Sequence, residues 1–170
     1  LKPPLRLFRT VNLAGMTNAD TFAVFEGYLL AGQGGSSISY RLYDLADGTL
    51  KWTVPFTGAV ARLNYVPAYA NGVVILGGAT TTSIKTVRVS DGVVLWSDAI
   101  GNVEGRYPVV TDQLAIYHGP NLISVRGAVS GSNFWQKPTT TAAAPVSVFG
   151  NRVYMLGLNG VLNSFDLNGN

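Results

Sequence analysis

The stretch YDLADGTLKW, residues 43–52, decides the fold, because variants of it return three times along the chain. The later copies are RVSDGVVLW at 88–96, AVSGSNFW at 128–135 and an unfinished FDLNGN at 165–170. Each copy contains one turn glycine, and these four lie 44, 39 and 38 residues apart: Gly48, Gly92, Gly131 and Gly169. A tryptophan follows each of the first three by four residues: Trp52, Trp96 and Trp135. A period near forty, built from a strand, a tight turn and another strand, is typical of a β-propeller blade.

Short apolar runs repeat with the same period, at residues 28–31, 73–76, 114–117 and 153–156. They are rich in β-branched and aromatic residues and are too short for helices, so we interpret them as strands. A proline opens another apolar segment before three of them: Pro67, Pro108 and Pro145. The 20 glycines and 8 prolines interrupt every candidate helix. The sequence therefore predicts an all-β propeller of four-stranded antiparallel blades, about four of them in this chain.

The two ends of the chain differ in phase from a whole number of blades. Residues 4–15, PLRLFRTVNLAG, resemble the outer-strand stretch LKWTVPFTG at 50–58, with Phe8 near the position of Trp52. We therefore predict an outer strand at 4–15, followed by blades at about 16–58, 59–99, 100–138 and 139–170. An N-terminal strand in this phase is suited to complete the last sheet and hide its open edge. Three closures stay open: within one chain, head to tail between two copies, or with the remainder of a longer propeller.

The tryptophans and turn glycines are expected to join neighbouring blades. A large ring on an outer strand covers the apolar face of the next sheet, and the Asp-Gly turn supplies the positive φ that a tight hairpin needs. We therefore assign the seven repeat residues to blade docking rather than to ligand stacking: Trp52, Trp96, Trp135, Gly48, Gly92, Gly131 and Gly169.

The repeat also resembles a known family. The stretch VYMLGLNGVLNSFDLNG at 153–169, with the copies quoted above, is similar to the repeat of the quinoprotein-like propellers, roughly Ala-x-Asp-x-x-Thr-Gly with Trp four residues later. The resemblance spans essentially the whole chain and implies the propeller fold. That family includes pyrroloquinoline-quinone alcohol dehydrogenases and non-enzymatic relatives, among them a periplasmic lipoprotein that assists outer-membrane β-barrel assembly. Asp44 keeps the aspartate of the repeat, whereas Arg88 and Gly127 replace it in the next two copies.

The enzymes of that family imply residues that this chain lacks or scatters. They hold calcium with carboxylate and amide oxygens, use an aspartate as base, and cover the quinone with a disulfide between adjacent cysteines. This chain has no cysteine and nine acidic residues, of which the repeat turns account for Asp44, Asp47, Asp91 and Asp166. The other five are dispersed, with no spacing that argues for a hard-cation cage: Asp20, Glu26, Asp98, Glu104 and Asp112. We expect no cofactor and no metal.

The predicted function is a non-enzymatic scaffold or binding module that presents loops or an axial opening to a protein or an envelope polymer. The alternative is part of a quinoprotein-like oxidoreductase whose cofactor-binding residues lie outside this chain. Charged residues make up 12% of the chain, against about 25% in ordinary proteins, which suits extensive partner contact. The 12 basic residues are scattered singly, so we expect no nucleic-acid partner. No apolar run approaches the roughly eighteen residues of a membrane span, and a periplasmic, cell-surface or extracellular location is expected.

Candidate binding residues follow from propeller geometry, in which inner strands line the axis and their entry loops form one face. Polar residues just before the inner-strand prolines are the best candidates: Arg62, Asn64, Tyr65, Glu104, Arg106 and Tyr107. Glu104 and Arg106 alternatively form a surface ion pair with each other. His118, the only histidine, replaces the glycine that ends the apolar run in other copies. We interpret it as an exposed turn residue, with a functional role as the alternative.

Overall fold

The computed structural model describes most of the chain as an all-β structure. The described residues are 10, 12–13, 15–57, 65–77, 83–99, 107–119, 122–139, 146–157 and 160–169, and they contain fifteen strands and no helix. The all-β prediction is therefore confirmed. No helix in these ranges has the length and apolar character needed to cross a membrane.

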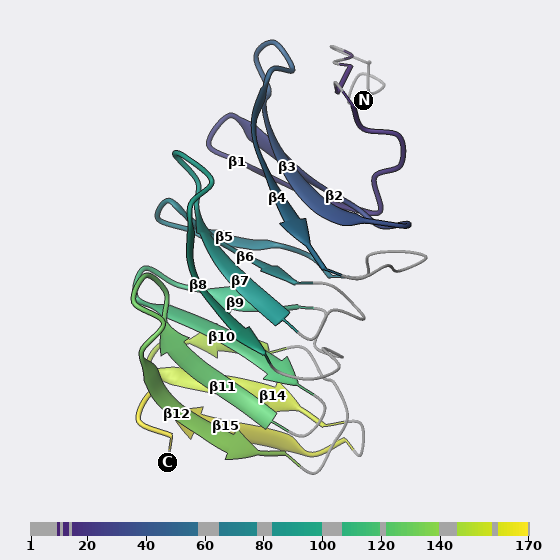
Figure 1. Cartoon of the computed structure of the whole chain (residues 1–170). Helices are drawn as coiled ribbons and strands as arrows, with labels where there is room; N and C mark the ends of the chain where they lie inside the picture. The colour runs from purple at the N-terminus through teal and green to yellow at the C-terminus, as the bar shows by residue number, and fades with distance from the viewer. Residues whose placement is uncertain are drawn as a thin grey trace, which may run out of the picture.

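The strands form four separate antiparallel sheets in chain order, which we call blades 1 to 4 (Figure 1). Blade 1 contains β1 (Thr21–Phe25), β2 (Tyr28–Gln33), β3 (Ile38–Asp44) and β4 (Leu50–Phe56). Blade 2 contains β5 (Ala68–Ala70), β6 (Val73–Gly77), β7 (Ser83–Arg88) and β8 (Val94–Ala99). Blade 3 contains β9 (Val109–Val110), β10 (Leu114–Gly119), β11 (Leu122–Gly127) and β12 (Asn133–Pro138). Blade 4 has three strands among the described residues: β13 (Val146–Phe149), β14 (Arg152–Leu156) and β15 (Leu162–Asp166).

Each strand pairs with its neighbours in the sequence, because the connections within a sheet are short hairpins. The first turns of blades 1 and 2 are built on Glu26-Gly27 and Asn71-Gly72, all four with positive φ, which matches the right-handed twist of the flanking strands. The turns that contain the repeat glycines combine a glycine of positive φ with hydrogen bonds to side-chain oxygens. The Asp44 carboxylate accepts the amide of Ala46 at 2.8 Å. These contacts fix the hairpins and therefore the register of each sheet.

The core lies between the sheets rather than within one of them. Three clusters of buried hydrophobic residues join blade 1 to blade 2, blade 2 to blade 3, and blade 3 to blade 4. We call the face of a blade that contacts the next blade its forward face, and the opposite face its backward face. None of the three clusters joins described residues of blade 4 to blade 1, and Figure 1 shows these two blades at opposite ends of the row.

Two parts of the predicted organisation fall outside the described residues. Most of the predicted outer strand at 4–15 is not described, and its described residues, 10, 12–13 and 15, are not in a strand. The predicted blade boundaries, after residues 58, 99 and 138, lie in or beside stretches that are not described, so they remain predictions.

Candidate functional site

The predicted axial residues lie mostly outside the structural description. This holds for Arg62, Asn64, Glu104 and Arg106, whose binding role stays a prediction. Tyr107 is described and exposed. Tyr65 is buried, and its ring covers Gly77 so closely that a Cβ atom there would lie 2.8 Å from it. Burial raises the pKa of the Tyr65 hydroxyl well above its ordinary value, so this side chain belongs to the core between blades 2 and 3.

His118 is not an exposed turn residue, so that interpretation was wrong. It lies in β10, opposite Ile123, with 2% of its surface exposed. Its Nε2 atom is 3.2 Å from the hydroxyl of Thr139, which is also buried. The strand continues to Gly119, so His118 occupies a paired strand position rather than a turn.

The repeat tryptophans contact the next blade in one recurring geometry. The indole N–H of Trp52 donates to the carbonyl of Val89 at 2.7 Å, that of Trp96 to Ala128 at 3.0 Å, and that of Trp135 to Leu167 at 2.8 Å. Each ring also lies directly on the repeat glycine of the next blade. A Cβ atom on Gly92, Gly131 or Gly169 would lie 2.6, 2.6 or 2.9 Å from the Cγ atom of the ring that covers it. Only glycine leaves room for the indole at these positions.

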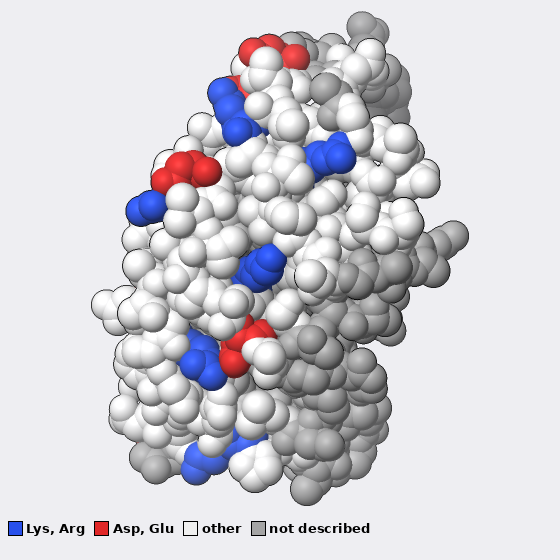
Figure 2. Space-filling model, in the orientation of Figure 1, with Lys and Arg blue, Asp and Glu red and all other residues white. Residues whose placement is uncertain are grey.

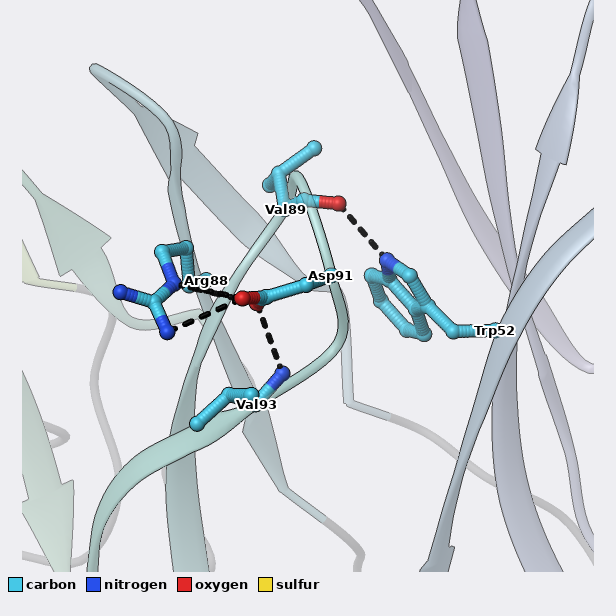
Figure 3. A network of polar contacts seen from close by, with 5 residues as sticks. All are labelled: Trp52, Arg88, Val89, Asp91 and Val93. Atoms are coloured by element: carbon cyan, nitrogen blue, oxygen red, sulfur yellow. Dashed lines mark hydrogen bonds and ion pairs between the residues drawn. The ribbon is translucent and has the colours of Figure 1, made fainter.

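The turn that receives Trp52 is held by its own polar side chains (Figure 3). The Asp91 carboxylate accepts the Val93 amide at 3.1 Å and pairs with the Arg88 guanidinium at 2.9 Å. These hydrogen bonds lower the pKa of the Asp91 carboxyl, with Arg88 as the largest cause. The turn therefore keeps one shape, which aims the Val89 carbonyl at the indole.

A second polar cluster joins blades 2 and 3. The Tyr117 hydroxyl donates to Asp98 at 2.5 Å, and Arg126 donates to the same hydroxyl at 2.7 Å. Arg126 also pairs with Asp98 at 2.8 Å and donates to the Gly131 carbonyl at 3.1 Å. Burial, followed by the hydrogen bond to Asp98, raises the pKa of Tyr117 to about 12. Every member has a structural partner, so we assign this cluster to blade docking.

This pKa shift predicts a loss of stability at high pH. The folded-state pKa of Tyr117 lies above its ordinary value of 10.0. The contribution of Tyr117 to the free energy of unfolding is therefore complete below pH 10 and is lost as the pH rises towards 12. In Tyr117→Phe, the free energy of unfolding should decline less steeply between pH 10 and 12. Urea unfolding at pH 8, 10 and 11 measures the slope. Some decline in the free energy of unfolding should remain in Tyr117→Phe, because burial also raises the pKa of Tyr40 and Tyr65. A decline as steep as that of the unaltered chain would contradict the assignment.

A groove of about 450 Å³ lies at one end of blades 1 to 3, the end that carries the β1–β2, β5–β6 and β7–β8 turns. Its polar lining comes from three turns and the strand end beside one of them: Glu26 after β1, Asn71 after β5, Arg88 at the end of β7, and Ser90 after it. Leu95 and the exposed Val129 add apolar surface. Phe25 at the end of β1 and Tyr69 in β5 lie next to these turns and stack on each other, with ring centroids 4.1 Å apart. Desolvation, followed by the hydrogen bond to Glu26, raises the pKa of Tyr69.

A second hollow, of about 520 Å³, opens at the same end between later blades, lined by residues 110–114 with Ala70 and Leu167. Charged side chains line both sites: Glu26 and Arg88 in the groove and Asp112 in the second hollow. Figure 2 shows basic and acidic side chains scattered over a face that is otherwise uncharged in its described part. Among the described residues, no three His, Cys, Asp or Glu side chains form a group that could hold a metal ion. The groove offers mixed apolar and polar contact, the composition of a recognition surface.

No protein-family profile matches the sequence, and no curated protein matches it. Solved structures do match. The designed Ika4 protein aligns with 92% of this chain and 96% of its own, at 13% identity and a TM-score of 0.72. BamB from Moraxella catarrhalis aligns with 85% of this chain and 44% of its own, at 16% identity and a TM-score of 0.64. A europium-containing methanol dehydrogenase aligns with 75% of this chain and 27% of its own, at 16% identity and a TM-score of 0.58.

The fold is that of a β-propeller. The chain spans less than half the length of the BamB and methanol dehydrogenase chains. At these identities the similarity concerns the fold alone, which supports a propeller scaffold and confirms the predicted fold class.

The groove was not predicted from the sequence, because its residues come from four hairpins spread over three blades. The Asn71-Gly72 pair is a strong hairpin signal and locates one of the turns. Nothing in the sequence shows that Glu26, Arg88 and Val129 meet beside it.

Proposed function

We propose that this propeller is a non-enzymatic binding module of the quinoprotein-like class, and that it holds a protein partner at the groove of blades 1 to 3. The observation that carries the proposal is the composition of that groove. Glu26, Asn71 and Arg88 place acceptor and donor groups beside Leu95 and Val129. A surface of this kind suits an extended peptide segment, whose backbone needs hydrogen bonds and whose side chains need apolar contact.

Rigid turns support this role. Arg88 is held by Asp91, and the same turn receives Trp52 from blade 1. The wall of the groove is therefore fixed by the contact that docks the blades, so it is formed before a partner arrives. A preformed surface loses less conformational entropy on binding than a flexible loop does. The low charge content and the resemblance of the repeat favour a place in the cell envelope or outside the cell.

The proposal is tested by panning a random peptide phage library against the purified chain. We expect enriched peptides that bind Val129→Asp at least tenfold more weakly, because a carboxylate would replace the apolar wall. Val161→Asp, which alters an equally exposed valine on blade 4, should bind them as the unaltered chain does. Peptides that bind both variants equally, or no enrichment, would count against the groove.

The oxidoreductase alternative is tested on the same preparation. Pyrroloquinoline quinone and calcium are added, the chain is desalted, and the quinone absorbance is measured. We expect no retained quinone and no dye-linked alcohol oxidation. Stoichiometric retention would replace the scaffold proposal with the enzymatic one.

A further inference from the structure

We infer that the forward face of blade 4 docks on the backward face of blade 1 in a second copy of this chain. The inference is independent of the groove and of any partner bound there. It follows from comparing the two end faces with the three blade interfaces inside the chain.

Blade 4 exposes side chains at positions that are buried in the other blades. Leu162 pairs with Leu156 across β14 and β15, as Tyr40 pairs with Gly32, Ile84 with Gly77 and Ile123 with His118. The residues equivalent to Leu162 are therefore Tyr40, Ile84 and Ile123, and each has 0% of its surface exposed. Leu162 has 62% exposed, its partner Leu156 is also exposed, and so is Phe149 at the other end of the same face. Blade 4 thus leaves its forward face uncovered, with these apolar side chains beside the exposed Arg152 and Ser164, which hydrogen-bond to each other.

Blade 1 presents the opposite kind of face. Phe22 pairs with Ala31 as Val146 pairs with Met155 in blade 4, so Phe22 is the equivalent of Val146. Val24 is the equivalent of Val110 in blade 3. Val146 and Val110 are buried against the preceding blade, whereas Phe22 is 65% exposed and Val24 is exposed as well. Tyr43 and Gly48, which belong to the same blade, are buried. The open part of this face therefore lies over the inner strands.

The two open faces complement each other. Every internal interface joins the forward face of one blade to the backward face of the next. The chain carries one further face of each kind, so two copies joined head to tail satisfy both. The three described strands of blade 4 correspond to the first three strands of the other blades. The exposed residues of blade 1, Phe22 and Val24, also lie on its first strand, β1. A heterologous contact of this kind closes into a ring when the rotation allows it, and two copies would supply eight blades.

A second copy also explains the edge of blade 4. Each of the other sheets has four strands, whereas β15 borders blade 4 as a third and last strand among the described residues. An exposed strand edge invites pairing with another chain.

The test is the mass of the intact chain, measured by multi-angle light scattering at about 10–50 micromolar, a concentration at which a stable dimer persists. We expect twice the 18.0 kDa of one chain. Leu162→Asp and Phe22→Asp should each give a monomer that still unfolds cooperatively, because both side chains are exposed in the single chain. Phe134→Asp, an exposed phenylalanine of an interior blade, should remain a dimer.

Each other outcome overturns the inference. A mass of one chain would show that the end faces do not pair at this concentration. Dissociation by Phe22→Asp but not by Leu162→Asp would indicate a symmetric contact between two first blades. Masses above two chains that neither Leu162→Asp nor Phe22→Asp lowers would show association through another surface.

Discussion

Replacing Trp52 with alanine should lower the free energy of unfolding by about 3–5 kcal/mol, the cost of deleting a buried large aromatic side chain. The indole fills the interface between blades 1 and 2, lies on Gly92, and donates to the Val89 carbonyl. Its removal leaves a cavity and a carbonyl without its donor. The same substitution at Trp96, which is less buried, should fall at the lower end of this range.

Urea unfolding followed by circular dichroism measures the change. Trp52→Phe is the matched variant, because it retains most of the ring contact and loses the hydrogen bond. It should cost less than the alanine variant. A loss below about 1 kcal/mol in Trp52→Ala, as for surface substitutions, would show that the ring does not dock the blades.

Replacing Gly92 with alanine should destabilise the chain through two separate effects. Its φ of 75° lies in the left-handed region, where a residue with a Cβ atom loses about 1–2 kcal/mol. The new Cβ atom would also lie 2.6 Å from Cγ of Trp52, and overpacking of this kind costs about 1–3 kcal/mol more. The total expected loss is therefore about 2–5 kcal/mol.

Gly72 provides a matched control within the same blade. Its φ is 76°, and a Cβ atom there would meet nothing within 4 Å. Gly72→Ala should therefore show the backbone effect alone, about 1–2 kcal/mol. Urea unfolding of the two variants side by side separates backbone strain from the contact with Trp52. Equal losses would mean that the interface yields to the extra methyl group.

The fold was predictable because the repeat is marked by glycines and tryptophans at positions where no other residue type would fit equally well. Gly92, Gly131 and Gly169 combine positive φ with a ring placed directly on them. The tryptophan four residues after Gly48, Gly92 and Gly131 reaches the next blade in each case. Local turn chemistry and contact between blades therefore impose the same spacing, which makes the repeat visible in a single sequence.

The site was less predictable, because it depends on which loops meet. Arg62 and Glu104 were chosen by their distance from inner-strand prolines, and they lie outside the described residues. His118 stands where other copies have the glycine that ends the apolar run, which predicts a turn, whereas β10 extends through Gly119. The groove combines four hairpins from three blades, and no period in the sequence indicates where separate hairpins converge.

Asp98 shows how a dispersed residue gains its role from neighbouring blades. In the sequence it is one of five acidic residues with no partner in spacing. In the structure it accepts hydrogen bonds from Tyr117 and Arg126 of the next blade. Such a contact joins positions 19 and 28 residues apart, and depends on how two sheets pack rather than on local propensity.

The most direct test of the account is a double-mutant cycle between Trp52 and Gly92, measured by urea unfolding. If the indole of one blade and the glycine of the next form one unit, Gly92→Ala should cost only the backbone strain, about 1–2 kcal/mol, once Trp52 is alanine. The two substitutions should then be coupled by about 1–3 kcal/mol, the size of the relieved overpacking. Losses that add to within about 0.5 kcal/mol, as for distant sites, would contradict docking of the blades through this contact.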